Sequence, residues 1–169
     1  MPDRETIERA RRDKREGKSP STQAGEFVRE EMDHIREGKH GARSTRQAIA
    51  IGLSKARRAG VKLPPPKKGT ASAKTRESAK RDAAAGRSST ARKKRPSAKR
   101  SRAVTKALRR EGHSAASKSA LARQARSAAK KRGAASRSAS ARKAARTRGP
   151  RERAAASRRA ARTRARRGR

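Results

Sequence analysis

Apolar and small residues recur every three or four positions in the run S-T-R-Q-A-I-A-I-G-L-S-K-A-R-R-A-G, residues 44–60. At 100° per residue these side chains fall within an arc of roughly 140°, and the basic side chains fall outside it. Ser44 can accept the amide of Gln47 while the Gln47 side chain reaches back to the Ser44 amide, as in a capping box. Gly60 can supply the left-handed residue that ends a helix. The pattern predicts a complete helix over 45–58 with one packing face and one basic face.

A second amphipathic segment precedes this one and ends at Gly38. Its apolar residues share one side, starting near Ser21, and its opposite side is an acidic stripe. The stripe consists of Glu26, Glu30, Asp33 and Glu37. Because only residues 39–43 connect the two segments, we expect an antiparallel helical hairpin of about 22–37 and 45–58.

The two helices of this hairpin are expected to pack closely. Small residues at every fourth position of the second helix, with Gly52 in the middle, let two backbones approach each other. Glu31 lies on the apolar side of the first helix, so we expect it to pair with Arg46 or Arg57. The pairing side chains are predicted to be Phe27, Ile35, Ile49, Leu53 and Ala56. Ordering the hairpin costs more free energy than these side chains recover, so we expect a homodimer or a partner helix through this module.

The rest of the chain lacks such a pattern. Residues 1–20 are polar with almost no apolar face, which predicts a frayed or conditional helix ahead of the hairpin module of 21–63. Three consecutive prolines begin a Pro-rich linker, 64–69. Beyond it, residues 70–169 form a tail rich in Ala, Arg, Lys and Ser. Within this tail, residues 101–133 contain two capped segments that predict a weak helical hairpin.

Charge separates the two parts of the chain. Residues 1–66 carry 16 basic and 10 acidic residues, whereas residues 67–169 carry 37 basic and 4 acidic ones, and the formal net charge of the chain is +39. Like charges at this density repel, and alanine buries little area, so we expect the free tail to be disordered and the neutralised tail to be partly helical. The sequence thus predicts a mainly α-helical protein with extensive disorder, in which a helical hairpin carries a low-complexity basic tail with conditional helices.

The sequence offers little candidate chemistry. It contains no cysteine, which excludes disulfides and thiolate metal sites and favours a cytoplasmic location. The three histidines, His34, His40 and His113, lack the spacing of metal ligands, so we interpret them as solvated or capping residues. No nucleophile lies in a pattern with a base, and no run approaches the roughly 18 apolar residues of a membrane span. We therefore expect no enzyme activity, no cofactor or metal, and no membrane insertion.

One short motif between the predicted helices has a nucleic-acid interpretation. Residues 38–41 are G-K-H-G, a G-x-x-G pattern like that with which KH modules hold a nucleic-acid backbone. Because no strand pattern for a KH fold accompanies it, we interpret it as a flexible basic loop that approaches phosphates.

The basic tail is the strongest functional signal. Lys and Arg gain affinity for nucleic acid when they displace its condensed counterions, and contacts to phosphates carry little sequence information. The sequence therefore predicts non-sequence-specific DNA binding and compaction by a histone-like, nucleoid-associated protein. The residues expected to contact nucleic acid are Lys93, Lys94, Arg95, Lys99, Arg100, Arg109, Arg110, Lys130, Lys131, Arg132, Arg158, Arg159, Arg166 and Arg167.

Two alternatives share these features. In the first, the protein associates with RNA or the ribosome through the same cations, because counterion release favours any nucleic acid. In the second, the helical hairpin binds a protein partner and the tail tethers this adaptor to nucleic acid. With Phe27 as its single aromatic residue, the chain lacks stacking platforms for sequence-specific recognition of single strands.

The run G-K-H-G-A-R-S-T-R-Q-A-I-A-I-G-L-S-K-A-R-R-A-G-V-K-L-P-P-P resembles a family of small, functionally uncharacterised bacterial proteins. That family is built around an S-x-x-Q-A-I-A-I-x-L-S-x-A-R-x-A-G core, and the resemblance covers residues 21–66. The later run R-A-V-T-K-A-L-R-R-E-G-H-S-A-A-S-K-S-A-L-A-R-Q-A-R is similar to tails in the same family. This resemblance implies a bacterial, cytoplasmic protein and no reaction. The Ala/Lys/Arg/Ser tail is also similar in composition to those of linker-histone-like and histone-like nucleoid proteins.

Overall fold

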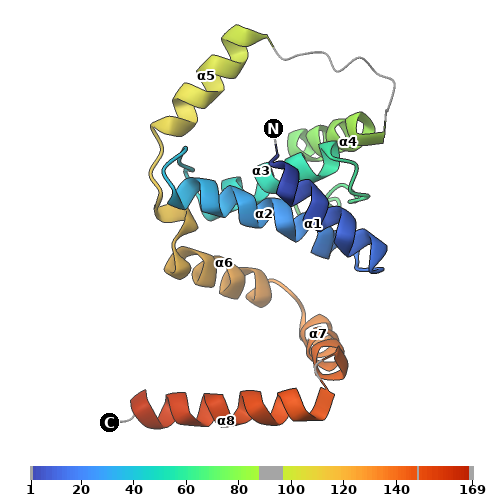
Figure 1. Ribbon diagram of the computed structural model, residues 1–169, viewed down its shortest axis with the longest axis vertical. Coiled ribbons are helices and arrows are strands. Elements are labelled where there is room, and N and C mark those ends of the chain that lie inside the picture. The colour runs from blue at the N-terminus through green and yellow to red at the C-terminus, as the bar shows by residue number, and fades with distance from the viewer. Residues whose placement is uncertain (1, 88–96, 148, 168–169) are drawn as a thin grey trace. The chain divides into compact units, whose positions relative to one another are not determined.

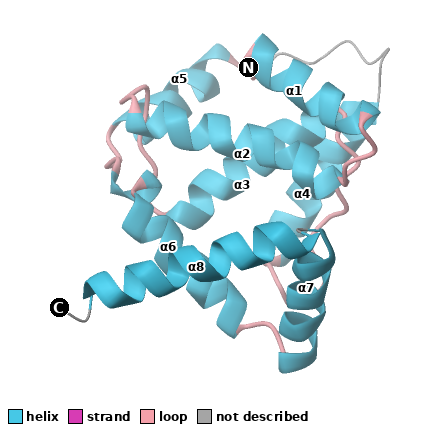
Figure 2. Cartoon of the chain, turned by 60° about the horizontal axis from the view of Figure 1, so that its bottom comes forward, coloured by secondary structure: helices cyan, strands magenta, loops and turns pink. Residues whose placement is uncertain are grey.

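The computed structural model describes residues 2–87, 97–147 and 149–167, and its regular structure is helical in that part of the chain (Figures 1 and 2). The elements are α1 (Arg4–Arg15), α2 (Pro20–Arg36), α3 (Thr45–Arg58), α4 (Ala73–Arg87), α5 (Ala98–Arg109), the short 3-10 turn η1 (Ser114–Ala116), α6 (Lys118–Lys130), α7 (Ala134–Thr147) and α8 (Gly149–Arg167). They form two compact units, Met1–Gln124 and Ala125–Arg169.

The prediction of extensive disorder is wrong, because most of the described residues beyond the prolines lie in helices α4 to α8. Alanine, arginine and lysine all favour a helix, and here this preference prevails over charge repulsion. Serines of the tail cap the new helices, a role that composition alone does not reveal. Ser72, Ser97 and Ser117 each accept a backbone amide three residues ahead at 3.2 Å.

The predicted ends of α3 are confirmed in most details. The Ser44 hydroxyl accepts the Gln47 amide at 3.2 Å, but the Gln47 carboxamide accepts the amide of Arg43 at 2.9 Å and not that of Ser44. At the other end Gly60 has a φ of 91°, and the amide of Val61 donates to the carbonyl of Ala56 at 3.1 Å.

Helices α2 and α3 pack closely together, and Gly52 makes their approach possible. A Cβ atom at Gly52 would lie 2.7 Å from Val28 Cα, a distance that real Cβ contacts do not show. Around this point Phe27, Ile35 and Ala56 are fully buried. The predicted pairing residues Ile49 and Leu53 are half-buried and contact the same core.

The core has two parts, each of which includes residues from outside the α2–α3 pair. One consists of Ala10, Ala24, Phe27 and Ala56, with Ile7, Leu53, Val61 and Leu63 packed against it. The other consists of Met32, Ile35, Ala42, Ala48, Ala115 and Ala116, with Val28, Ile49 and Leu121 packed against it. The hairpin thus gains packing partners from α1 and from the η1 region within one chain.

Helix α1 packs along α2, where the sequence predicted a frayed or conditional helix. Apart from Ile7, its contacts are small or polar: Thr6 and Ala10 are buried, and Arg9 Nε lies 2.7 Å from Glu26 Oε2. The backbone amide of Asp3 donates to Glu30 at 3.2 Å. Part of the acidic stripe of α2 is therefore an attachment surface for α1, which the near absence of large apolar residues in α1 concealed.

Helix α4 packs against α3 and so belongs to the first unit. The carboxylate of Asp82 accepts a hydrogen bond from Ser54 at 2.6 Å and one from Arg58 at 2.7 Å. Ala79 is buried beside them, and Gly86 lies so close to the carbonyl of Arg57 that no side chain would fit. One acidic and two small residues thus hold a helix that the sequence assigned to the free tail.

The segment after α5 docks on the open end of the α2–α3 pair through backbone carbonyls. Gly41 and Ala42 donate their amides to the carbonyls of Leu108 and Gly112, at 2.9 and 3.1 Å. The buried hydroxyl of Thr45 donates to the carbonyl of Ala115 at 2.7 Å. Helix α6 and most of α5 lie within the region predicted as a weak hairpin, 101–133, and the residues between the two helices contact α2 and α3.

The partner of the buried Glu31 is Lys55, and the predicted pairing with Arg46 or Arg57 is wrong. Lys55 Nζ lies 2.8 Å from Glu31 Oε2 and 3.2 Å from Glu30 Oε1. Burial lowers the pKa of Lys55, but the carboxylates of Glu31 and Glu30 outweigh this effect, so the pKa is raised from its ordinary value of 10.5. This ion cluster therefore stabilises the fold below that value, and its contribution is lost as the pH rises through the raised pKa.

Gly52→Ala is expected to destabilise the first unit, because its Cβ would be forced against Val28 Cα at 2.7 Å and Phe27 O at 2.9 Å. Overpacking of this kind costs about 1–3 kcal/mol. The matched control is Gly25→Ala on the exposed side of α2, where nothing lies within 4 Å. Alanine there should raise the free energy of unfolding by about 0.5–1 kcal/mol. Urea unfolding measures both, and equal effects would contradict a close α2–α3 contact.

Gly41→Ala is expected to displace the docked segment, because its Cβ would collide with the backbone carbonyl of Glu111. Trypsin should then cleave after Arg109 and Arg110 faster than in the unmodified chain. Gly112→Ala is the matched control, since a Cβ at that position has open space. Identical cleavage rates for both variants and the unmodified chain would show that the segment is not held by this contact.

Candidate nucleic-acid interface

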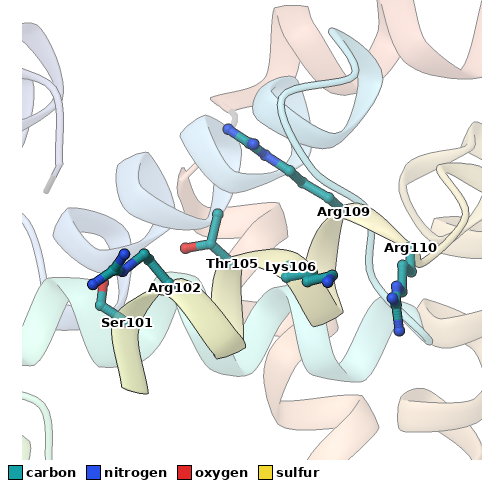
Figure 3. Close-up of a pocket in the computed structure, with 6 residues that line it drawn as sticks. All are labelled: Ser101, Arg102, Thr105, Lys106, Arg109 and Arg110. Carbon is teal, nitrogen blue, oxygen red and sulfur yellow. The ribbon is translucent and has the colours of Figure 1, made fainter. Parts of the chain in front are cut away.

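One face of α5 gathers cationic side chains around an open pocket (Figure 3). The pocket is lined by Ser101, Arg102, Thr105, Lys106, Arg109 and Arg110. These residues recur at spacings of one, three and four, which places them on a single side of a helix. The four cations of this face, Arg102, Lys106, Arg109 and Arg110, are exposed and form the α5 basic face.

The position of the α5 basic face is fixed at one end. Ser97 caps the start of α5, and near its other end the carbonyl of Leu108 accepts the amide of Gly41. Most of the helix is exposed, including Val104, which is 54% accessible. The fold thus presents these cations from the side of a helix that is tied to the first unit near residue 108.

The second unit is more basic still. Its sequence, residues 125–169, contains 18 Lys and Arg but a single acidic residue, Glu152. At 100° per residue, five arginines of α8 fall within an arc of roughly 100° on one side of the helix. These five, Arg151, Arg158, Arg159, Arg162 and Arg166, are exposed and form the α8 basic face. One carboxylate cannot neutralise so many cations, so α8 offers an uncompensated positive stripe.

The predicted contact residues whose side chains the structure describes are all exposed, but they lie in separate places. One group lies on α5 or just after it: Lys99, Arg100, Arg109 and Arg110. A second group lies at the end of α6 or just after it: Lys130, Lys131 and Arg132. The third group lies on α8: Arg158, Arg159 and Arg166. Lys93, Lys94 and Arg95 lie outside the described residues, as does the side chain of Arg167. Sequence reasoning missed Arg102 and Lys106, although their spacing of seven and three from Arg109 would have placed them on one face.

The G-x-x-G loop does not present free amides to a phosphate. The amides of Gly38 and Lys39 donate to the carbonyls of Ile35 and His34, and that of Gly41 donates to Leu108. Three of the amides that would hold a nucleic-acid backbone are thus engaged within the chain. The loop therefore does not hold a phosphate through these amides, and it receives the segment after α5 instead; an approach of its basic side chains to phosphates stays a prediction.

Comparisons with known proteins found a similarity for one part of the chain. Residues 4–68, which span α1 to α3 and the prolines, match the model of a family of unknown function (DUF6496), so this part of the chain is similar to that family. No curated protein and no solved structure gave a significant match. Among the helices that the structure describes, none is long and apolar enough to cross a membrane.

Neutralising the α8 basic face is expected to lower the affinity for nucleic acid and to make that affinity less dependent on salt. The variant replaces Arg158, Arg159, Arg162 and Arg166 by Gln. Removing one arginine that meets a phosphate should reduce the slope of log K against log salt by about 0.9, and removing all four by roughly 3–4. Fluorescence anisotropy with a duplex DNA across a salt series measures the slope.

The control removes the same number of exposed cations from α1. It replaces Arg4, Arg11, Lys14 and Arg15 by Gln. A slope that changes as much in the control as in the α8 variant would mean that net charge, and not the α8 basic face, determines binding.

Proposed function

We propose that the protein binds double-stranded DNA without sequence specificity and compacts it, as a histone-like, nucleoid-associated protein. The observation that carries this proposal is the exposure of the α5 and α8 basic faces beside very few acidic residues. Such faces bind polyanions because each phosphate that meets a cation releases condensed counterions. The compositional likeness of the tail to linker-histone-like tails agrees with this function.

Duplex DNA is a better match to these faces than a specific single-stranded RNA. Sequence-specific binding of single strands relies on aromatic side chains that stack on the bases. Phe27 is the single aromatic residue of the chain, and it is 1% exposed in the core. The remaining contacts available are those between arginine or lysine and phosphate, which are insensitive to base sequence.

Compaction follows from the division of the cations between two units. The α5 basic face belongs to the first unit and the α8 basic face to the second. A chain whose cationic faces lie in two compact units can neutralise phosphates at two places, and linked binding events of this kind gain from a high effective concentration. One chain would therefore bridge two DNA segments.

The bridging role is tested with a variant of the α5 basic face. Replacing Arg102, Lys106, Arg109 and Arg110 by Gln should preserve salt-dependent binding to short duplexes but reduce the condensation of a plasmid. Gel shifts on two duplexes of unrelated sequence measure binding, and light scattering measures condensation. Both duplexes should bind the unmodified chain equally within about a factor of two, since phosphate contacts dominate.

Three outcomes would overturn the proposal in different ways. Binding that is insensitive to salt, or confined to one short sequence, would contradict phosphate contacts as the source of affinity. A strong preference for RNA of matched length would favour an RNA- or ribosome-associated protein. Specific capture of one protein by the full chain after nuclease treatment, without DNA condensation, would favour an adaptor.

A further inference from the structure

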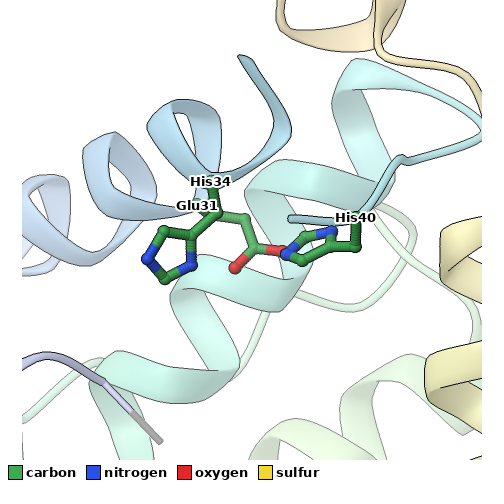
Figure 4. A group of neighbouring side chains, drawn as sticks. All are labelled: Glu31, His34 and His40. Atoms are coloured by element: carbon green, nitrogen blue, oxygen red, sulfur yellow. The ribbon is translucent and has the colours of Figure 1, made fainter. Parts of the chain in front are cut away.

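Two histidines that are unrelated by any metal-binding spacing in the sequence meet at one buried carboxylate. Glu31 and His34 lie one turn apart on α2, and His40 approaches from the loop after α2 (Figure 4). One nitrogen or oxygen from each of the three lies within 4.8 Å of the others. The loop turns at Gly38, whose φ of 76° favours glycine, and this turn brings His40 back over α2.

Apart from its ion pair with Lys55, the carboxylate of Glu31 has few of the partners that such burial requires. It is fully buried, and neither of its oxygens accepts a hydrogen bond from the residues that the structure describes. Lys55 Nζ lies 2.8 Å from Oε2 and forms an ion pair with it. Oε1 faces His40 Nε2 at 3.5 Å. A buried carboxylate with so few partners carries a large desolvation cost that a nearby cation would offset.

The hydrogen bond of His40 leaves a lone pair directed at this carboxylate. His40 Nδ1 lies 3.1 Å from the carbonyl of Gly41, which only accepts, so in the neutral ring Nδ1 carries the hydrogen. Nε2 is then an acceptor that faces the acceptor Oε1 of Glu31. Two acceptors at this distance need a proton or a metal ion between them.

His34 is oriented in a similar way. Its Nε2 lies 3.3 Å from Oδ2 of Asp3, so the carboxylate accepts the Nε2 hydrogen of the neutral ring. Figure 4 shows a ring nitrogen of His34 on the side of the Glu31 carboxylate. Histidines that bind metals usually donate their other ring hydrogen to a carboxylate or a carbonyl. Here His34 donates to the carboxylate of Asp3, and His40 donates to the carbonyl of Gly41.

The local charge also favours a cation. Three carboxylates, those of Asp3, Glu30 and Glu31, surround the histidines. Lys55 contacts two of them, and Lys39, which forms an ion pair with Glu37, also lies near Asp3 and Glu30. Within a chain of net charge +39 this is a pocket of excess negative charge. A divalent ion would compensate the carboxylates that Lys55 leaves unbalanced.

We propose that Glu31, His34 and His40 form a binding site for a divalent transition metal ion, with zinc as the expected occupant. Two imidazoles and one carboxylate are a donor set that suits zinc, and they leave one position for water. Zinc bonds of about 2.0–2.2 Å place tetrahedral ligands roughly 3.3–3.6 Å apart, so small side-chain rotations would bring these atoms into range. The metal would tie α2 to the loop that receives the segment after α5. This proposal is independent of DNA binding.

Titration of the full chain with Zn²⁺ alone, without DNA, tests the site by calorimetry and thermal unfolding. We expect one Zn²⁺ per chain, an increase in Tm, and a loss of affinity as the pH falls and protons compete for the imidazoles. His34→Gln and His40→Gln should each weaken binding at least tenfold. His113→Gln, which changes the third histidine of the chain, is the matched control and should leave the affinity unchanged. The ¹⁵N shifts of the imidazoles identify the bound nitrogens even if a variant unfolds.

Two results would overturn the metal site. The first is binding that is absent, or that is equally strong in the His34 and His40 variants and the His113 control. The second is a protein that zinc leaves unchanged but that acid stabilises, with Tm rising between neutral and mildly acidic pH and no such rise in His40→Gln. In that case a proton on His40, and not a metal ion, is the cation that Glu31 requires.

Discussion

The close approach of α2 and α3 at Gly52 is the contact on which the rest of the first unit depends. With one aromatic residue and mostly alanine among its apolar residues, the chain can bury little area unless two backbones come together. The absence of a side chain at Gly52 lets Val28 and the backbone of α2 fill that space. Once the pair is formed, α1 gains a surface on α2 and α4 gains one on α3. Short-range packing of small residues thus replaces the large apolar side chains of a typical core.

Two of the four carboxylates in the basic second half of the sequence help to attach it to this pair, and the other two act within their own helices. After residue 66 the chain contains four acidic residues among 37 basic ones. Asp82 joins α4 to Ser54 and Arg58 of α3. Glu111 lies 3.9 Å from Arg43, where the segment after α5 docks. Glu77 pairs with Lys80 within α4, and Glu152 lies in the first turn of α8, where a negative charge favours the helix.

The sequence predicts the α2–α3 pair well because its signals are local. A serine cap, a terminal glycine and an apolar stripe each act within a few residues. Together they predict both ends of α3 correctly. The packing of α1 on α2 and the presence of α4 escape prediction because these helices are held by Thr6, Ala10, Ala79 and Asp82, residue types that are common on surfaces. The energy of such contacts depends on what lies opposite them, which composition does not reveal.

The candidate interfaces divide in the same way. The sequence shows that the protein is rich in basic residues. It does not show which of them share one side of α5, because that depends on where the helix begins and ends. His40 lies near Glu31 and His34 because of the conformation of the loop that carries it. The spacing of these residues in the sequence could not predict this. Long-range proximity is the information that single-sequence patterns lack.

The docking of residues 108–115 through backbone carbonyls has a consequence for how this protein tolerates change. Gly41, Ala42 and Thr45 donate hydrogen bonds to the backbone carbonyls of Leu108, Gly112 and Ala115. Every amino acid has such a carbonyl, so these hydrogen bonds do not depend on the side chains of the accepting residues. Apart from the buried Ala115, the docked segment can therefore vary in much of its sequence while the hydrogen bonds persist. Gly41, against which the carbonyl of Glu111 is packed, has no such freedom. Substitutions should accordingly accumulate unevenly across this interface, on the side that contributes carbonyls.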